Sequence, residues 1–325
     1  MKIVFEHSTP LPVLRYGGTE RVLFWLMKAL VRKGHHVSLI GHPQCKLEGT
    51  GIQLLPKENE DWRSIIPKTT DIVHLFSSPS KELDFPLIIT IEGNGQVGEV
   101  FHKNTVFISK KHAENHYSNV FIYNGIDLSE YPFPLKKRKA TLPSASQFLF
   151  LAKGKWNVKN LKDCIRVCRN QKKFLHIAGG RSWLPSRYLY SYGMVDQKKK
   201  LELLEKTEIL LAPVRWHEPF GIFIIEAMAM GLPVFGSPYG SLPELIRSNS
   251  GLICQNYSEF ESAVQKLPHS FYPEEIRNYI ENNFSIETIA QQYIELYEKI
   301  IYGQDLHSTP PKTVSTLSPE TLLPF

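Results

Sequence analysis

Apolar residues along the chain follow two alternating patterns. Short apolar runs that end at glycine, proline or polar residues are typical of buried strands. Between these runs, apolar residues at helical spacing predict helices, for example at residues 19–30, 109–117, 222–230 and 286–301. Strands that alternate with helices predict an α/β fold with doubly wound parallel sheets. The apolar runs predict strands at residues 2–6, 36–40, 52–55, 71–75, 87–91, 105–108, 120–123, 148–152, 173–178, 190–195, 209–213, 232–235 and 251–254.

The length of 325 residues predicts about two domains. We place the first domain at residues 1–130, a proline-rich and basic linker at 131–145 and the second domain at 146–284. A helix with one apolar face follows at 285–302. The last segment, 303–325, is polar and contains four prolines, which predicts a disordered tail.

The net charge of +6 is distributed unevenly. Residues 1–130 carry 14 basic and 14 acidic side chains, residues 131–200 carry 17 and 2, and residues 201–325 carry 7 and 16. The excess of +15 in the middle segment indicates a partner that bears phosphate. A nucleotide diphosphate, an anionic lipid surface and a nucleic acid all fit this requirement. The basic residues lack the interleaved aromatic residues of a nucleic-acid stacking surface, so we expect no nucleic acid partner.

The four cysteines, Cys45, Cys164, Cys168 and Cys254, form no C-x-x-C pair, which is typical of a protein from a reducing compartment. The first residues contain too short an apolar run for a signal peptide, and no run of 18 apolar residues occurs. The sequence therefore predicts a cytoplasmic protein. A peripheral contact with the inner face of an anionic membrane is compatible with the basic middle segment.

The stretch from Arg215 to Leu245 combines two elements that suit a phosphate-bearing sugar. A loop that contains Glu218 leads into a predicted helix, and Glu226 follows eight positions later. The first N–H groups of a helix and its partial positive charge favour an anion such as a diphosphate. Carboxylates beside them accept hydrogen bonds from sugar hydroxyls. The main-chain N–H groups of Phe220, Gly221 and Ile222 would complete the anion site.

This stretch, EPFG…EAMAMGLPV, resembles the donor-binding E-x7-E element of the GT-B glycosyltransferases of retaining family 4. The run YGGTERV…LVRKGHHV resembles the first unit of the same family. The resemblance covers residues 1–302 and implies two Rossmann-like domains, with doubly wound parallel sheets, that face a cleft. It also implies that Glu226 holds the ribose hydroxyls of the donor and that Glu218 holds the donor sugar.

The resemblance assigns the donor diphosphate to basic and glycine residues of both domains. Lys153 and Lys159 stand where the family has an arginine and a lysine that contact the diphosphate, and Lys155 is an alternative for the first of these roles. Gly17 and Gly18 would lie near the donor phosphates from the side of the first domain. Glu218, Lys153 and Lys159 are therefore the predicted catalytic residues. The chain has no D-x-D pair, which agrees with a mechanism that needs no metal and no other cofactor.

The chain departs from the family at Glu92, where family members often carry a histidine beside the reacting sugar. We predict that His7, Glu92 and Asn94 lie on the acceptor side. The run from Gly93 to Gly98 also satisfies the G-x-G-x-x-G pattern. A dinucleotide-binding motif must open a helix, but too few residues separate Gly98 from the next strand, which argues against NAD binding.

Together these features predict a retaining, metal-independent hexosyltransferase of cell-envelope polysaccharide biosynthesis. The donor would be a UDP, GDP or ADP sugar, and the acceptor a glycan or a lipid-linked molecule. Two alternatives use the same fold: a protein that binds nucleotide sugars without turnover, and a phosphorylase-type enzyme.

Overall fold

The structure is a computed structural model that describes residues 1–13, 17–57, 61–133, 146–182, 186–267, 270–314 and 320–325. The described chain divides into two compact units, the first formed by residues up to 126 and from 285 to 314, and the second by residues 127–284 and 320–325. The chain therefore passes from the first unit to the second after Ile126 and returns at Ser285. Most of the linker predicted at 131–145, with its basic run at 136–139, lies outside the described residues.

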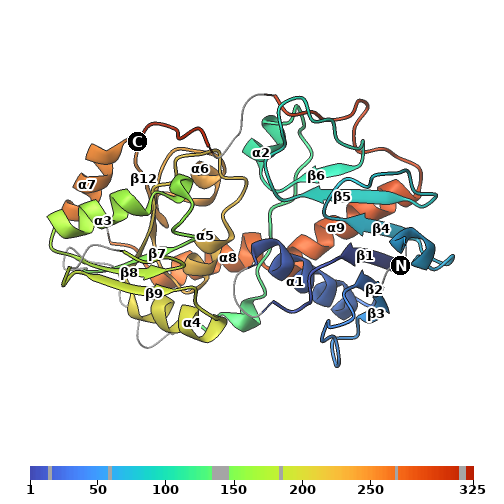
Figure 1. The fold of residues 1–325 in the computed structure, drawn as a ribbon, viewed down its shortest axis with the longest axis horizontal. Helices are drawn as coiled ribbons and strands as arrows, with labels where there is room; N and C mark the ends of the chain where they lie inside the picture. Colours follow the sequence, from blue (N-terminus) through green and yellow to red (C-terminus); the bar gives the residue numbers. More distant parts are fainter. Residues whose placement is uncertain (14–16, 58–60, 134–145, 183–185, 268–269, 315–319) are drawn as a thin grey trace. The chain divides into compact units, whose positions relative to one another are not determined.

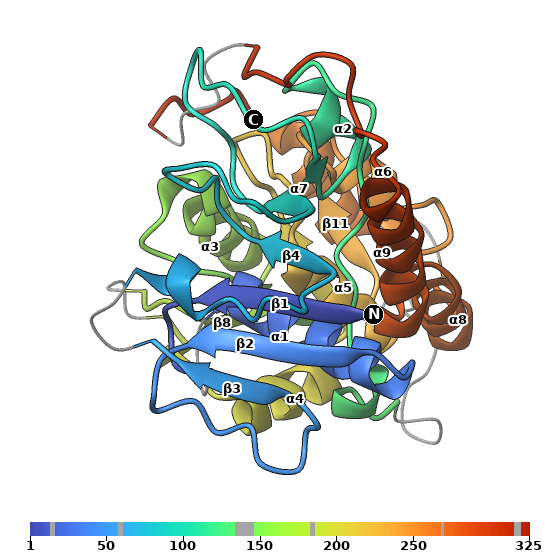
Figure 2. The same ribbon diagram turned by 90° about the vertical axis from the view of Figure 1, so that its right-hand side faces the viewer.

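The first unit is built on a six-stranded sheet in which all neighbouring strands are parallel. The strand order is β3-β2-β1-β4-β5-β6, and Figure 2 shows β1, β2 and β3 side by side. The strands are β1 (Lys2–His7), β2 (His36–Gly41), β3 (Gln53–Pro56), β4 (Ile72–Leu75), β5 (Leu87–Ile91) and β6 (Thr105–Phe107).

The helices of the first unit come from both ends of the chain. They are α1 (Gly18–Arg32), the 3-10 helix η1 (Trp62–Ile65), α2 (Lys110–Glu114) and α9 (Ile286–Ile301). Helix α9 packs against α1 and β5, and its apolar face, including Ile289, Tyr293 and Tyr297, is buried. A surface ion pair of 2.5 Å between Arg32 and Glu287 joins α1 to α9.

The second unit contains a second six-stranded parallel sheet, with the order β12-β11-β10-β7-β8-β9. Figure 1 shows β7, β8 and β9 side by side. Its helices include α3, which packs against α7, and α5, which packs against α8. The strands are β7 (Gln147–Leu151), β8 (Phe174–Ala178), β9 (Leu189–Gly193), β10 (Ile209–Ala212), β11 (Val234–Gly236) and β12 (Gly251–Ile253). The helices are η2 (Leu128–Glu130), η3 (Asn157–Lys159), α3 (Leu161–Asn170), α4 (Gln197–Lys206), α5 (Ile222–Ala229), α6 (Leu242–Leu245), α7 (Tyr257–Lys266) and α8 (Pro273–Phe284).

The two sheets have the same topology. In each sheet the first strand pairs with the second on one side and with the fourth on the other, so the strand order reverses between β1 and β4 and between β7 and β10. Doubly wound sheets bind ligands outside the carboxyl ends of the strands at this reversal. The predicted fold class of two doubly wound parallel sheets is confirmed, and the reversal points indicate where a site is to be sought in each unit.

Three local predictions need correction. Residues 120–123 form no strand, and Phe121 makes only an isolated bridge with Phe107. Helix α1 runs from Gly18 to Arg32 with Gly17 as its N-cap residue, so it is longer at both ends than the predicted range of 19–30. The helix predicted at 109–117 is shorter, because the regular helix α2 ends at Glu114.

The prediction of disorder for residues 303–325 does not agree with the described part of that segment. Lys312 and Thr313 donate main-chain hydrogen bonds to His116 and Glu99, and Leu323 donates one to Arg215. Prolines exclude regular helices and sheet interiors, but they leave single main-chain hydrogen bonds to a neighbouring loop open. Within the described residues, no helix is both long and apolar enough to cross a membrane.

Candidate functional site

The strand-order reversal of the second sheet places two loops next to each other. Strand β7 ends at Leu151 and continues into the loop that holds Lys153 and Lys159, whereas β10 ends at Ala212 and continues into the loop that holds Glu218. Because β7 and β10 are parallel neighbours, both loops leave the same edge of the sheet. The predicted phosphate-binding and sugar-binding loops therefore meet at the expected position.

Lys159 and Glu218 form the central contact between these loops. The Lys159 ammonium lies 2.5 Å from Oε2 of Glu218, and both side chains are buried. The indole Nε1 of Trp216 donates a hydrogen bond of 2.7 Å to the same carboxylate oxygen. The Lys159 ammonium also lies 5.2 Å from the centre of the Trp216 ring and 5.1 Å from that of Phe223, close enough for cation–π attraction.

The loop that holds Glu218 is fixed by a glycine turn from another part of the unit, which we call the 240–241 turn after Gly240 and Ser241. Gly240 has φ +61°, and a Cβ atom at this position would lie 2.3 Å from both the main-chain N and O of Glu218. Ser241 donates its N–H to the Glu218 carbonyl (3.0 Å) and its hydroxyl to the Phe220 carbonyl (2.5 Å). Only glycine allows this approach, so the main chain of Glu218 is held tightly.

Helix α5 begins directly after this loop. Its N-cap residue is Gly221, with φ +87°, and no side chain caps the helix. The first N–H groups of a helix have no carbonyl partner within the helix, so an uncapped N-terminus suits an anionic ligand. Phe220, Gly221 and Ile222, which the sequence indicates as anion-binding N–H groups, thus lie where the loop with Glu218 enters the helix.

Glu226 lies in the second turn of α5 and is buried. Its Oε1 accepts hydrogen bonds from the Lys200 ammonium and from the Tyr131 hydroxyl, each at 2.5 Å. Lys200 also donates to the Tyr131 hydroxyl at 2.9 Å, so the three groups form a closed triangle. The structure therefore places the two glutamates of the E-x7-E element in separate ion pairs, one with Lys159 and one with Lys200.

Lys153 and Lys155 lie in the same loop as Lys159, nearer the end of β7. The Lys153 ammonium lies 5.2 Å from the centre of the exposed Trp156 ring, and Lys155 is exposed. Between them, Gly154 donates its N–H to the carbonyl of Gly179, whose φ of +91° lets β8 end close to this loop. Both lysines thus lie at the carboxyl edge of the sheet.

The first unit holds a second group of the predicted residues, at the carboxyl ends of β1 and β5. His7 ends β1, and its Nε2 lies 3.9 Å from Oε1 of Glu20. Glu92 follows β5, and its Oε2 accepts a hydrogen bond of 2.8 Å from the Asn124 amide, whereas its buried Oε1 has no partner among the described residues. Burial raises the pKa of Glu92 to about 7, and the nearby Glu20 carboxylate adds to this rise. Burial lowers the pKa of His7, which Glu20 opposes.

Two buried histidines hold the loop that follows Glu92. His112 lies in α2, and His116 lies two residues after the end of this helix. His112 Nε2 bonds the Gly93 carbonyl (3.0 Å), and the Gly95 N–H donates to His116 Nε2 (3.1 Å). His116 Nδ1 bonds the His112 carbonyl, so the ring is neutral with its proton on Nδ1. Burial lowers the pKa of both rings, which agrees with this assignment.

The other predicted residues of the first unit lie near this group. Asn94 belongs to the loop held by His112 and His116, and Gly17 and Gly18 form the start of α1. A Cβ atom at Gly17 would lie 2.7 Å from Oε2 of Glu20, so the glycine leaves room for that carboxylate. The prediction that Gly17 and Gly18 contact the donor stays a prediction.

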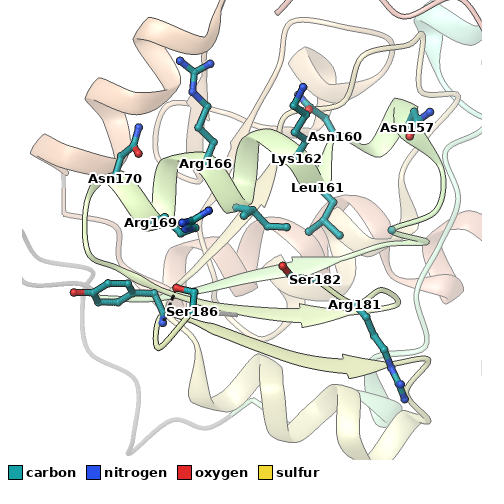
Figure 3. Close-up of a pocket in the computed structure, with 13 residues that line it drawn as sticks. Asn157, Asn160, Leu161, Lys162, Arg166, Arg169, Asn170, Arg181, Ser182 and Ser186 are labelled. Carbon is teal, nitrogen blue, oxygen red and sulfur yellow. Dashed lines mark hydrogen bonds between the residues drawn. The ribbon is translucent and has the colours of Figure 1, made fainter. Parts of the chain in front are cut away.

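A pocket of about 800 Å³ in the second unit extends along α3 and the segment after β8. Gly154, Asn157 and Asn160 of the loop after β7 line it, but Lys159 and Glu218 do not. It carries the cations Lys162, Arg166, Arg169 and Arg181, which contribute to the positive charge of the middle segment. Figure 3 shows that Lys162 and Arg166 point to one side of α3, whereas Arg181 points to the opposite side. The cations do not converge on one point, so we assign no ligand to this pocket.

Sequence reasoning missed the partners that hold the two glutamates. Trp216 stands two positions before Glu218 and could have been identified from this spacing, because an indole N–H is a common donor to a nearby carboxylate. Tyr131 and Lys200 are 95 and 26 positions from Glu226, and no local pattern indicates them. The described residues contain no group of three or more histidine, cysteine or acidic side chains that could hold a metal ion.

Part of the chain is similar in sequence to known proteins. Residues 136–285 match the family model of the glycosyl transferases group 1. A protein of Klebsiella pneumoniae described as "Uncharacterized 41.2 kDa protein in cps region" is 28% identical over 113 residues, which are 33% of this chain and 31% of that protein. The chain thus spans less than a third of the length of three of the curated relatives that it matches.

Solved structures match nearly the whole chain. AviGT4, a glycosyltransferase involved in Avilamycin A biosynthesis, superimposes with a TM-score of 0.75 at 21% identity, over 93% of this chain and 98% of that one. HepE of Anabaena, solved in complex with UDP and glucose, gives a TM-score of 0.67 at 15% identity, over 92% of this chain and 100% of that one. The chain therefore has the GT-B fold, and its residues 136–285 match the model of the glycosyl transferases group 1 family.

Proposed function

We propose that this protein is a glycosyltransferase that moves a hexose-type sugar from a nucleotide sugar to a glycan or lipid-linked acceptor. The observation that carries the proposal is the buried Lys159–Glu218 pair beside the uncapped start of α5, at the strand-order reversal of the second sheet. The family match of residues 136–285 supports it, and the complex of HepE with UDP and glucose shows that a protein of this fold binds such a nucleotide.

The donor diphosphate would bind to the positive groups of the second unit. Lys159 and the first N–H groups of α5, with Phe220, Gly221 and Ile222, would neutralise the charge that develops on the leaving diphosphate. Lys153, with Lys155 as the alternative, would approach from the end of β7. This set supplies the positive charge that a metal ion would otherwise provide, so we propose a reaction without a metal.

The two glutamates would hold the donor from opposite ends of its diphosphate. Glu218, beside the start of α5, would accept hydrogen bonds from the sugar and stabilise positive charge at its anomeric carbon. Glu226, in the next turn, would hold the ribose hydroxyls, with Lys200 and Tyr131 fixing its orientation. Transfer with retention of the anomeric configuration is part of this proposal and follows from the resemblance to family 4.

The acceptor would bind to the first unit, where His7, Glu92 and Asn94 lie at the carboxyl edge of the sheet. The unpartnered Oε1 of Glu92 is suited to a hydroxyl group. The match to a protein of the Klebsiella cps region favours a role in cell-envelope polysaccharide biosynthesis. A cytoplasmic enzyme with a basic middle segment could then meet a lipid-linked acceptor at an anionic membrane surface.

The first experiment is thermal unfolding with UDP, GDP, ADP and their sugars, with NAD and a short RNA as controls. At a ligand concentration of about 100 times Kd, binding adds roughly 2.7 kcal/mol to stability. We expect one nucleotide family to stabilise the wild type and to lose most of this effect in Glu226→Ala. Stabilisation by NAD or RNA alone would contradict the proposal.

Turnover is tested with the donor that this panel identifies. Sugar transfer to a glycan or lipid-linked acceptor, with the product's anomeric configuration read by NMR, supports the full proposal. Donor binding without any product would indicate a binding protein on the same fold, and transfer to inorganic phosphate would indicate a phosphorylase-type enzyme. An inverted product would overturn the retaining mechanism alone.

A further inference from the structure

The last described residues of the chain, 321–325, lie against the candidate donor loop of the second unit. The Leu323 N–H donates a hydrogen bond of 2.9 Å to the Arg215 carbonyl, and the Arg215 side chain returns one of 2.6 Å from Nε to the Leu323 carbonyl. The Phe325 ring packs against the Phe260 ring of α7, with ring centres 5.6 Å apart. This reciprocal pair of hydrogen bonds holds the segment in a defined register against Arg215.

Arg215 connects this segment to both members of the central ion pair. Its N–H donates a hydrogen bond of 2.7 Å to the Val158 carbonyl, directly before Lys159. Its carbonyl leads into Trp216, whose indole donates to Glu218. The main chain at Arg215 therefore lies between the loop with Lys159 on one side and Leu323 on the other.

The same segment also reaches the 240–241 turn that fixes Glu218. The Tyr239 hydroxyl donates a hydrogen bond to the Pro324 carbonyl. Tyr239 directly precedes Gly240, and the ring of Tyr239 lies 6.4 Å from that of His217 in an edge-to-face arrangement. Leu323 thus contacts Arg215 in the loop that holds Glu218, and Pro324 contacts Tyr239, directly before the turn that holds this loop.

We propose that Leu323 and Pro324 are positioning residues that hold the loop with Glu218 against the 240–241 turn in the geometry that binds the donor. The identity of the ligand in this proposal rests on the proposed function. The proposal gives a role to a segment for which the sequence predicts only disorder. Neither Leu323 nor Pro324 contacts the groups assigned to the donor, so the proposed role of these two residues is positioning and not catalysis.

Three variants break the contacts one at a time. Leu323→Pro removes the N–H that donates to the Arg215 carbonyl. Arg215→Met removes the Nε donor to the Leu323 carbonyl but keeps an unbranched side chain. Tyr239→Phe removes only the hydroxyl that donates to the Pro324 carbonyl. The matched control is Arg169→Met, which loses the same charge at an exposed position of α3 in the same unit. Tyr239→Phe is the mildest change. If Leu323→Pro fails to fold, Tyr239→Phe still tests the proposed role.

Two readouts separate positioning from general stability. The first is the indole N–H resonance of Trp216, assigned with Trp216→Phe, in protein without ligand. We expect each of the three variants to shift it, and Arg169→Met to leave it unchanged. The second is the Kd for the stabilising nucleotide sugar. It should rise roughly three- to tenfold in each variant, the range that corresponds to one lost hydrogen bond. The thermal midpoint of the control should stay at the wild-type value.

The outcomes decide the two proposals separately. An unchanged indole resonance together with an unchanged donor Kd in all three variants would overturn the positioning role. A weaker Kd and a shifted resonance support it. Where the wild type binds no nucleotide sugar at all, the proposed function fails, and the indole resonance alone decides whether residues 323–324 position the loop.

Discussion

The Lys159 ammonium lies 2.5 Å from Oε2 of Glu218, and this contact joins the loops that leave two adjacent strands, β7 and β10. Both side chains are less than a tenth exposed, so water screens the pair weakly. The Trp216 indole supplies a second donor to the same oxygen. Through this contact the lysine stabilises the fold, and by our proposal it also has an electrostatic role when the donor is bound.

Breaking this pair from one side should destabilise the protein strongly. In Lys159→Met the Glu218 carboxylate stays buried without its cation, and we expect a loss of about 3–5 kcal/mol in the free energy of unfolding. In the double variant Lys159→Met/Glu218→Gln the buried charge is gone, so a substantial part of this loss should return. Urea unfolding of both single variants and the double variant measures the coupling.

An exposed pair serves as the control for this cycle. Lys199 and Glu202 are paired at 2.9 Å on α4, with side chains that are 43% and 50% exposed. Lys199→Met should lower the free energy of unfolding far less than Lys159→Met does, because solvent screens this pair and its side chains lose conformational entropy when they form it. Strictly additive losses at Lys159 and Glu218 would show that the buried contact contributes no coupling.

Gly240→Ala should disturb the candidate donor site without touching a charged group. The added Cβ would lie 2.3 Å from the Glu218 main chain, so the 240–241 turn and the loop must separate. Gly34→Ala is the control, because Gly34 also has positive φ, +85°, but nothing lies within 4 Å of the added atom. Both variants carry a left-handed strain of about 1 kcal/mol.

Only Gly240→Ala should therefore lower the affinity for the stabilising nucleotide, and its free energy of unfolding should fall further than that of Gly34→Ala. Isothermal titration and urea unfolding of the two variants test this. Equal nucleotide affinity in both would show that the position of the Glu218 main chain does not matter for binding.

The sheets and the long helices could be predicted because their signal is local. The apolar period of α9 gives its bounds, Ile286–Ile301, directly from the sequence, because the spacing of buried residues reports one helix face. The failure at 120–123 has a physical reason. Its apolar residues pack beside Phe107 without continuing the hydrogen-bond ladder, and burial alone does not distinguish a strand from a buried extended loop.

The candidate site could be predicted residue by residue but not as a set of contacts. Glu218 and Lys159 each lie in a recognisable pattern, yet their contact spans 59 positions and depends on the adjacency of β7 and β10. The partners of Glu226 and the docking of Leu323 on Arg215 depend on tertiary packing in the same way. Tertiary contacts of this kind leave no periodic trace in one sequence.

Glu92 should make the stability of the protein fall as the pH rises. Its carboxyl has a pKa of about 7 in the folded chain against 4.5 when unfolded, so the folded state binds the proton more tightly between these values. The contribution of Glu92 to the free energy of unfolding is fully present below pH 4.5. It declines as the pH rises through 7, by about 3 kcal/mol in total. Glu92→Gln cannot ionise and should be more stable than the wild type at pH 8 but not at pH 4.5.

Glu20→Gln separates the two causes of this shift. The nearby Glu20 carboxylate raises the Glu92 pKa less than burial does, so removing its charge should reduce the pH dependence only in part. Chemical unfolding of the wild type and the two variants at intervals between pH 4.5 and 8 gives the slope of the free energy of unfolding against pH for each protein. A wild-type slope equal to that of Glu92→Gln would show that this carboxyl ionises in the folded chain as readily as in the unfolded one.

His74 should have the opposite effect at acidic pH. It is fully buried in the first unit, with Nδ1 2.7 Å from the Tyr297 hydroxyl and Nε2 2.8 Å from the Thr90 hydroxyl. Burial lowers its pKa to about 3, below the unfolded value of 6.5, so the unfolded chain takes up the proton first as the pH falls. The contribution of neutral His74 to the free energy of unfolding is fully present above pH 6.5. It declines as the pH falls towards 3, by about 5 kcal/mol in total.

Two substitutions distinguish the titration of His74 from the loss of its hydrogen bonds. His74→Gln removes the titrating ring, so the decline in unfolding free energy between pH 6.5 and 4 should become shallower than in the wild type. Tyr297→Phe leaves the ring but deprives Nδ1 of its partner, which should cost about 1–3 kcal/mol at pH 7 and preserve the acid slope. If both variants kept the wild-type slope, the acid sensitivity would have to come from other buried rings such as His112, whose pKa burial also lowers to about 3.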